Sequence, residues 1–268
     1  MKHKLNIIIL IALMFLAAHL VGLVIINNYL VKDLPYNIQR PELEERTSFI
    51  PIFITILFAT ILALILIRFR ALLLWKLWFF ISIAFTLAVS FSTFFNQFYA
   101  LILAILLALA KLFRINIIIN NVIEMFIYGG LAAIFVPLFN LFSIGIFLLL
   151  ISAYDAYAVF KSKHMIKLAK FQTKAKLFTG LHVPYKAKGE KKYTAAILGG
   201  GDIGFTLFFA GVILKEFNIL AAIITSLIIT LSLVVLFFIG KKGKFYPAMP
   251  VLSLGCLIAY LIIKFILF

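Results

Sequence analysis

Two aspartates lie inside hydrophobic stretches of the chain, and their position suggests chemistry. Asp155 stands in the apolar run 148–160, and Asp202 follows three consecutive glycines in the run 197–205. A carboxylate in hydrocarbon costs about 2.5–3.5 kcal/mol on insertion scales, so such a group is a functional candidate by default. Two carboxylates that lie close together tend to share one proton, which is the electrostatic basis of hydrolysis by an aspartate pair.

The composition indicates an integral membrane protein. The 268 residues are 65% hydrophobic with a mean hydropathy of +1.20, whereas soluble domains are about 45–50% apolar. The net charge of +16 would suggest nucleic acid in a soluble protein, but here the basic residues fall in short loops between apolar runs. We therefore expect a lipid bilayer and no nucleic acid as partner. One cysteine and four scattered histidines predict neither a metal nor a cofactor.

The apolar runs predict an all-α, multi-pass membrane protein in which residues 1–268 form one polytopic domain. A membrane span needs about 20 mostly apolar residues. Nine transmembrane helices are expected, at 5–26, 49–67, 71–92, 96–110, 117–136, 139–160, 194–214, 219–239 and 247–267. The first six therefore cover about 5–160, and the last three cover about 194–267, after a lysine-rich loop at 161–192.

The basic residues predict the orientation of these helices. With the N-terminus in the cytoplasm and the C-terminus outside, most of the 25 basic residues fall in inner loops, including Lys111. Ten lysines fall in the loop 161–192 alone. That loop either serves as a solvated topology determinant that binds anionic head groups or gates a site between the helices it joins. Glu124 is expected to make a polar contact near the interface.

The expected helices place the two aspartates at similar depth. Asp155 lies six residues before Lys161, which corresponds to about 9 Å of helix. Asp202 lies ten residues after Lys192, about 15 Å if that segment is helical. Because the two helices run antiparallel, both carboxylates fall on the inner side of the bilayer, where they could meet.

Two further motifs suit such a site. The glycines before Asp202 weaken a helix and admit close approach of another backbone. At the start of the last apolar run, two prolines bracket Ala248 and Met249. Proline is tolerated in the first turn of a helix, and here the pair would form a rigid wall beside a substrate channel.

Together these residues resemble the presenilin and signal peptide peptidase family of intramembrane aspartyl proteases. The matching motifs occur in family order on the sixth, seventh and ninth expected helices. They are Tyr154-Asp155, Gly199-Gly200-Gly201-Asp202 and Pro247-Ala248-Met249. Met249 departs from the family pattern, which has leucine at this position.

The resemblance implies a presenilin-like fold and an aspartic endopeptidase that cleaves within transmembrane segments or signal peptides. It implies that Asp155 and Asp202 are catalytic. It also implies that other residues line the site or engage substrate: Tyr154, Gly199, Gly200, Gly201, Pro247, Ala248 and Met249. The short loop between the aspartates looks like that of compact archaeal homologues, which implies an archaeal plasma membrane and no obligate accessory subunits.

Other interpretations remain open. An ion or proton transporter could use the buried aspartates as a relay, although this explains neither the glycines nor the prolines. A prepilin-type peptidase shares the Gly-x-Gly-Asp pattern but is expected to have fewer helices and no Pro-Ala motif. A catalytically silent relative would keep the aspartates for binding, and a structural pair would be satisfied by hydroxyl or backbone groups.

Overall fold

The computed structural model describes residues 5–69, 71–113, 116–162, 168, 171, 179–186, 193–240 and 246–267. Within these ranges the chain forms nine α-helices and one antiparallel pair of strands. The helices are α1 (Leu5–Val31), α2 (Phe49–Arg68), α3 (Leu72–Phe91), α4 (Gln97–Phe113), α5 (Ile117–Phe135), α6 (Leu141–Phe160), α8 (Gly200–Glu216), α9 (Ile219–Ile239) and α10 (Met249–Ile262). The strands are β1 (Gly180–Lys186) and β2 (Tyr193–Gly199).

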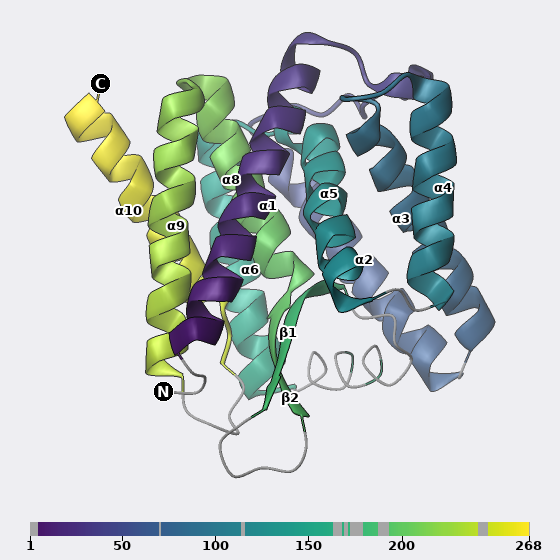
Figure 1. Ribbon diagram of the computed structural model, residues 1–268. Coiled ribbons are helices and arrows are strands. Elements are labelled where there is room, and N and C mark those ends of the chain that lie inside the picture. The colour runs from purple at the N-terminus through teal and green to yellow at the C-terminus, as the bar shows by residue number, and fades with distance from the viewer. Residues whose placement is uncertain are drawn as a thin grey trace.

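The expected helical membrane architecture is confirmed. In the described part of the chain, six helices are long and apolar enough to cross a bilayer, namely α1, α2, α3, α5, α6 and α9. Helices α4 and α10 are shorter apolar helices, and α8 has 17 residues. The helices stand side by side, and the two termini lie at opposite ends of the bundle (Figure 1). Most of the expected loop 161–192 lies outside the described residues.

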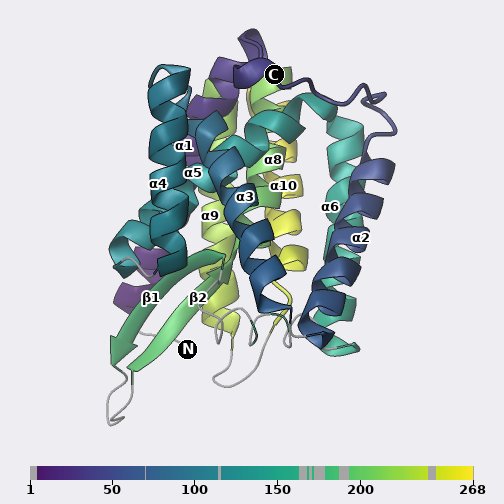
Figure 2. The same cartoon turned by 90° about the vertical axis from the view of Figure 1, so that its right-hand side faces the viewer.

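The surface of the bundle carries large apolar side chains that fit a lipid environment. Phe58 on α2 is 66% exposed, and Leu73 on α3 is 80% exposed. Soluble monomers rarely expose large contiguous apolar patches, so these side chains are suited to hydrocarbon. Helix α2 packs against α6 and α3 and stands at the edge of the bundle beside α6 (Figure 2).

Small residues let the helices approach closely around α1, which packs against α5, α8 and α9 (Figure 1). A Cβ added to Gly129 of α5 would lie 3.2 Å from the Cα of Gly22 in α1. Helix α4, which packs on α3, buries Ala100, Ala104 and Ala108 along one stripe. Such small-residue contacts supply the van der Waals packing that holds helices together in a membrane.

The predicted helix 194–214 is wrong in its first third. Residues 193–199 form strand β2, which pairs with β1, and the helix α8 begins only at Gly200. In β2 the side chains of Ala196 and Leu198 are buried, whereas Ile197 between them is 44% exposed. This alternation is the period of a strand. Hydropathy alone does not separate a short apolar strand from a helical segment.

The segment between α1 and α2 is docked on the bundle at the end away from the strands (Figure 1). Arg40 donates through Nη2 to the backbone carbonyl of Tyr29 at 2.8 Å. Tyr36 donates its hydroxyl to the carbonyl of Gln97 at 2.7 Å. These contacts make the segment a small cap rather than an extended loop.

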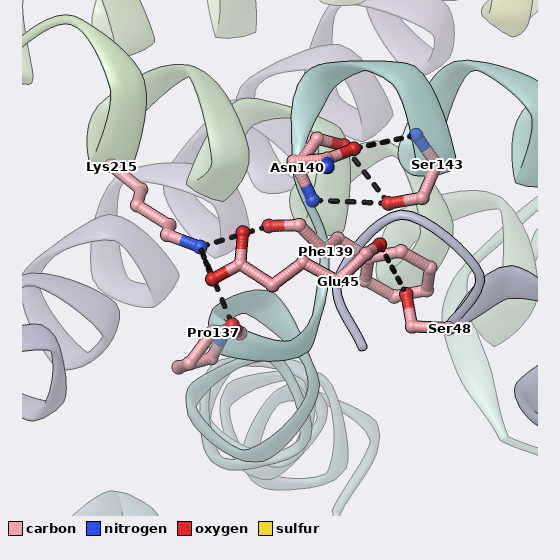
Figure 3. Close-up of polar contacts among 7 residues, drawn as sticks. All are labelled: Glu45, Ser48, Pro137, Phe139, Asn140, Ser143 and Lys215. Atoms are coloured by element: carbon pink, nitrogen blue, oxygen red, sulfur yellow. Dashed lines mark hydrogen bonds and ion pairs between the residues drawn. The ribbon is translucent and has the colours of Figure 1, made fainter. Parts of the chain in front are cut away.

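Lys215, near the end of α8, ties this cap to the helices (Figure 3). Its ammonium group lies 2.8 Å from a carboxylate oxygen of Glu45 and donates to the carbonyl of Phe139 at 3.1 Å. Beside it, Asn140 and Ser143 form a capping box that starts α6. One lysine thus links the end of α8, the segment between α5 and α6, and the cap.

We expect Lys215→Met to destabilise the protein more than Glu45→Gln. Glu45 is 47% exposed, and an exposed ion pair contributes about 0–1 kcal/mol. Lys215 also donates to the carbonyls of Pro137 and Phe139, and a carbonyl that loses its donor away from water costs about 1–3 kcal/mol. Equilibrium unfolding in detergent measures both variants, and equal losses would contradict this ranking.

Candidate active site

Asp155 caps a neighbouring helix. It lies in α6, five residues before the helix ends at Phe160. Its Oδ2 accepts a hydrogen bond of 3.1 Å from the backbone amide of Met249, and the Ala248 amide also donates to the carboxylate. Ala248 has no side chain that could cap α10, and Pro250 has no N–H to satisfy. Asp155 therefore supplies the acceptor that the N-terminus of α10 needs.

Asp202 lies in the first turn of α8, at the third helical position. Its carboxylate accepts a hydrogen bond from the backbone of Gly199, the residue that precedes the helix. This is the carboxylate half of a capping box. A Cβ on Gly199 would lie 3.2 Å from Oδ2 of Asp202, so glycine leaves room for the carboxylate. The segment between Lys192 and Asp202 is not the continuous helix on which the expected depth of about 15 Å depends, because an extended strand leads into this turn.

The structure brings Asp155 and Asp202 together. Helix α6 ends at the end of the bundle that carries the strands, and α8 begins where β2 ends (Figure 1). The two helices pack against each other and against α10. The two carboxylates lie within electrostatic reach of each other. Asp155 and Asp202 are both intermediate in exposure, neither fully buried nor fully exposed as whole residues. Within the described ranges, no three histidine, cysteine or acidic side chains converge as metal ligands would.

The other expected site residues surround this pair at different distances. Ala248 and Met249 contact Asp155 directly through their amides, and Pro247 directly precedes them in the chain. Tyr154 lies one position before Asp155 and meets the ring of Phe53 in α2 edge-on, with centroids 6.4 Å apart. Tyr154 therefore contacts α2, whereas Asp155 reaches α10.

Gly200 and Gly201 adjoin aromatic rings at the start of α8. A Cβ on Gly200 would lie 2.6 Å from the hydroxyl oxygen of Tyr128, a residue of α5. A Cβ on Gly201 would lie 3.2 Å from the ring of Phe205. Gly200 thus permits a close approach between α5 and the turn that carries Asp202.

Sequence reasoning missed a buried polar cluster beside this turn. Glu124 of α5 accepts hydrogen bonds from the hydroxyl of Tyr128 and from the ammonium group of Lys111 in α4. Asn121, one turn earlier on α5, binds both backbone groups of His182 in β1. These α5 residues recur at intervals of three and four, which places them on one helix face. That polar face inside an apolar helix is the signal that could have revealed the cluster.

The assignment of Lys111 to an inner loop is wrong. Helix α4 continues to Phe113, and the Lys111 side chain is buried against Glu124. The expectation that Glu124 makes a polar contact is confirmed, and the contact is an ion pair. A count of basic residues cannot distinguish a solvated loop lysine from a buried, paired one, because both carry the same charge.

We expect stability to fall in mild acid because of His182, which lies on β1 outside the helices. Burial lowers the pKa of its imidazole below the ordinary value, and the Lys111 ammonium acts in the same direction. The unfolded chain therefore binds a proton from about pH 6.5 downward, before the folded chain does. The contribution of the neutral His182 to the free energy of unfolding is therefore complete above that pH, and it is lost as the pH falls below it.

Thermal unfolding at about pH 7.5 and about pH 5.5 tests this dependence. The midpoint should drop on acidification in the wild type and drop less in His182→Asn, which does not titrate. An equal drop in both proteins would assign the pH dependence to other groups.

Comparisons with known proteins bear on the fold. No family model and no curated protein sequence matches the chain. A solved structure of a presenilin family intramembrane aspartate protease in space group C222 matches with a TM-score of 0.68 and 17% identity, covering 95% of this chain and 97% of that chain. A structure of such a protease in space group P2 matches with a TM-score of 0.65 and 19% identity, covering 94% and 95%. The chain therefore has the fold of the presenilin-family intramembrane aspartate proteases.

Proposed function

We propose that the protein is an intramembrane aspartic endopeptidase in which Asp155 and Asp202 form the catalytic pair. One observation carries this proposal: two carboxylates from different helices of a membrane bundle lie within electrostatic reach at one end of that bundle. The solved structures with the same fold are intramembrane aspartate proteases, which supports the assignment. The comparisons give the transporter alternative no support.

The proposed reaction needs one proton shared between the two carboxylates. One aspartate takes a proton from a water molecule as that water attacks the scissile carbonyl. The other donates its proton to the carbonyl oxygen, which becomes a hydroxyl in the tetrahedral intermediate. The carboxyl group that gained the proton then gives it to the leaving amine as the C–N bond breaks. The other carboxylate takes back a proton from a hydroxyl of the intermediate, which restores the singly protonated pair. Two electrostatically coupled carboxylates suit this exchange because they titrate as a unit.

The substrate is proposed to be a transmembrane segment that unwinds locally beside the pair. Gly199, Gly200 and Gly201 carry no side chains of their own before Asp202, which would allow an extended substrate to approach on the side away from Tyr128. The start of α10 at Pro247, Ala248 and Met249 would form the opposite wall, and Tyr154 would close the site toward α2. The substrates are accordingly membrane proteins or signal peptides.

Proteolysis by the purified protein tests the proposal. The protein in detergent is incubated with a helical transmembrane peptide, as wild type and as Asp155→Ala and Asp202→Ala. We expect cleavage by the wild type alone, and cleavage that survives either substitution would reject the assignment. Proton flux through proteoliposomes that needs both aspartates, without proteolysis, would establish the transporter instead. Because no accessory subunit is expected, the isolated chain should suffice.

The proposed topology places the N-terminus in the cytoplasm and the C-terminus outside an archaeal plasma membrane, with residues 1–268 as one polytopic domain. The positions of the termini at opposite ends of the bundle support an odd number of crossings. A reporter active only outside the cytoplasm, fused after Lys176, should be silent. The same reporter after Glu42, in the outer cap, should be active, and the reverse pattern would invert the topology.

A further inference from the structure

We propose that Tyr128 and Glu124 are positioning residues for Asp202. One face of α5 holds the junction between β2 and α8 from both sides, and so presents the Asp202 carboxylate to Asp155. This inference rests on the proposed function. Neither Tyr128 nor Glu124 is proposed to contact the substrate or to take part in the proton transfers.

The junction needs support because of its own sequence. Three consecutive glycines join a strand to a helix at Gly199, Gly200 and Gly201. Glycine has the largest conformational freedom to lose, so this turn is a weak point when taken alone. Asp202 follows directly, and any movement of the turn moves its carboxylate relative to Asp155. A defined geometry must therefore come from contacts outside the turn.

The ring of Tyr128 supplies the first of these contacts. A Cβ added at Gly200 would lie 2.6 Å from its hydroxyl oxygen and 3.0 Å from its Cε1, and one at Gly204 would lie 3.8 Å from its Cδ1. The ring thus spans the first turn of α8 from Gly200 to Gly204. It is 4% exposed and lies within electrostatic reach of Asp202.

The Glu124 carboxylate holds this ring in place. It accepts the Tyr128 hydroxyl on one oxygen and the Lys111 ammonium on the other. Lys111 in turn donates to the side chain of Asn120 at 2.7 Å. The hydrogen bond from the Tyr128 hydroxyl to Glu124 fixes the position of the ring. Because this hydroxyl donates to Glu124 and not to Asp202, the Asp202 carboxylate stays available to exchange a proton. A hydrogen-bonded buried carboxylate is a rigid anchor for the ring.

Asn121 supplies the contact on the other side of the junction. Its side-chain amide donates to the carbonyl of His182 at 2.9 Å and accepts from the amide of His182 at 3.2 Å. His182 is opposite Ile197 in the antiparallel pair of strands, and Ile197 lies two residues before Gly199. The same helix therefore holds β1, and through the pairing of β1 with β2 it holds the strand that leads into the glycines; it also packs against α8, the helix that follows them. The junction is fixed between two contacts on α5.

Cleavage kinetics test the positioning role. Tyr128→Phe keeps the ring and removes its anchor, and we expect kcat to fall about 10- to 100-fold, since a displacement of about 1 Å costs about 10²-fold, with KM nearly unchanged. Tyr29→Phe is the matched control, because Tyr29 also loses a buried hydroxyl hydrogen bond, to the carbonyl of Val89 at 2.9 Å. Tyr29→Phe should keep the kcat of the wild type, although it should lose about as much thermal stability as Tyr128→Phe.

A double variant separates positioning from general damage. Gly200→Ala should inactivate the enzyme because its Cβ meets the Tyr128 hydroxyl, whereas Gly145→Ala should have no effect because nothing lies within 4 Å of that position. Adding Tyr128→Phe to Gly200→Ala removes the closest contact, so the double variant should regain activity relative to Gly200→Ala alone. Such non-additivity is expected only of residues that act on each other.

Hydrogen exchange of residues 193–205 gives a readout independent of activity. Exchange there should be faster in Tyr128→Phe than in the wild type, and unchanged in Tyr29→Phe. If the wild-type protein cleaves nothing, the proposed function fails while exchange still decides whether α5 holds the junction. In a cleaving enzyme, an unchanged kcat in Tyr128→Phe overturns the inference, whether or not exchange changes. Strictly additive effects in the double variant overturn it as well.

Discussion

Asp202→Asn is expected to abolish cleavage while leaving the fold intact. Asparagine keeps an oxygen that can accept the backbone hydrogen bond from Gly199, so the first turn of α8 should be retained. It cannot accept or release the proton that the reaction needs, and acid–base catalysis contributes about 10²- to 10⁴-fold. The loss should reach at least the upper end of this range, because the two carboxylates act as a unit.

Asp155→Asn should lose activity to the same extent, since its oxygen can still accept the Met249 amide that starts α10. Each variant also removes one of two neighbouring carboxylates, so the unfolding midpoint in detergent should equal or exceed that of the wild type. Cleavage rates and unfolding midpoints are measured on the same preparations. A large drop in either midpoint would mean that the aspartate holds the fold, and its loss of activity would no longer indicate a catalytic role.

The helices could be predicted from the sequence because the bilayer dictates their length. The predicted ranges 49–67 and 219–239 lie within one residue of α2 and α9. A helix that leaves water for hydrocarbon satisfies its backbone internally, so an apolar run of about 20 residues has few alternatives. The two aspartates could be found for the same reason, because charged residues stand out in such runs.

The strands and the α5 cluster could not be found in this way, because they depend on partners distant in sequence. The segment 193–199 becomes a strand only because β1 pairs with it. Lys111 becomes a buried residue only because Glu124, thirteen positions later, meets it on the next helix. Hydropathy and charge counts score each residue by type, and neither measures which residues face each other across a fold.

The largest stability effect is expected from breaking the buried pair Lys111–Glu124. Both side chains are buried, so removing one charge leaves the other without an opposite charge to pair with, at a cost of about 3–5 kcal/mol. Lys111→Met and Glu124→Gln should each show this loss in unfolding titrations. The double variant should recover most of it, since replacing both charges of a buried pair is often neutral. The exposed pair Glu45–Lys215 is the control, with a coupling of about 1 kcal/mol or less.

The same double variant distinguishes charge from position. Glutamine at position 124 retains an oxygen that can accept the Tyr128 hydroxyl, so the ring that supports Gly200 should stay anchored. If positioning is what the cluster contributes, the double variant should cleave at a rate near that of the wild type, although both charges are gone. Additive stability losses in Lys111→Met and Glu124→Gln would show that the two side chains are not coupled. Recovery of stability without recovery of cleavage would show that the charges themselves act on the aspartate pair.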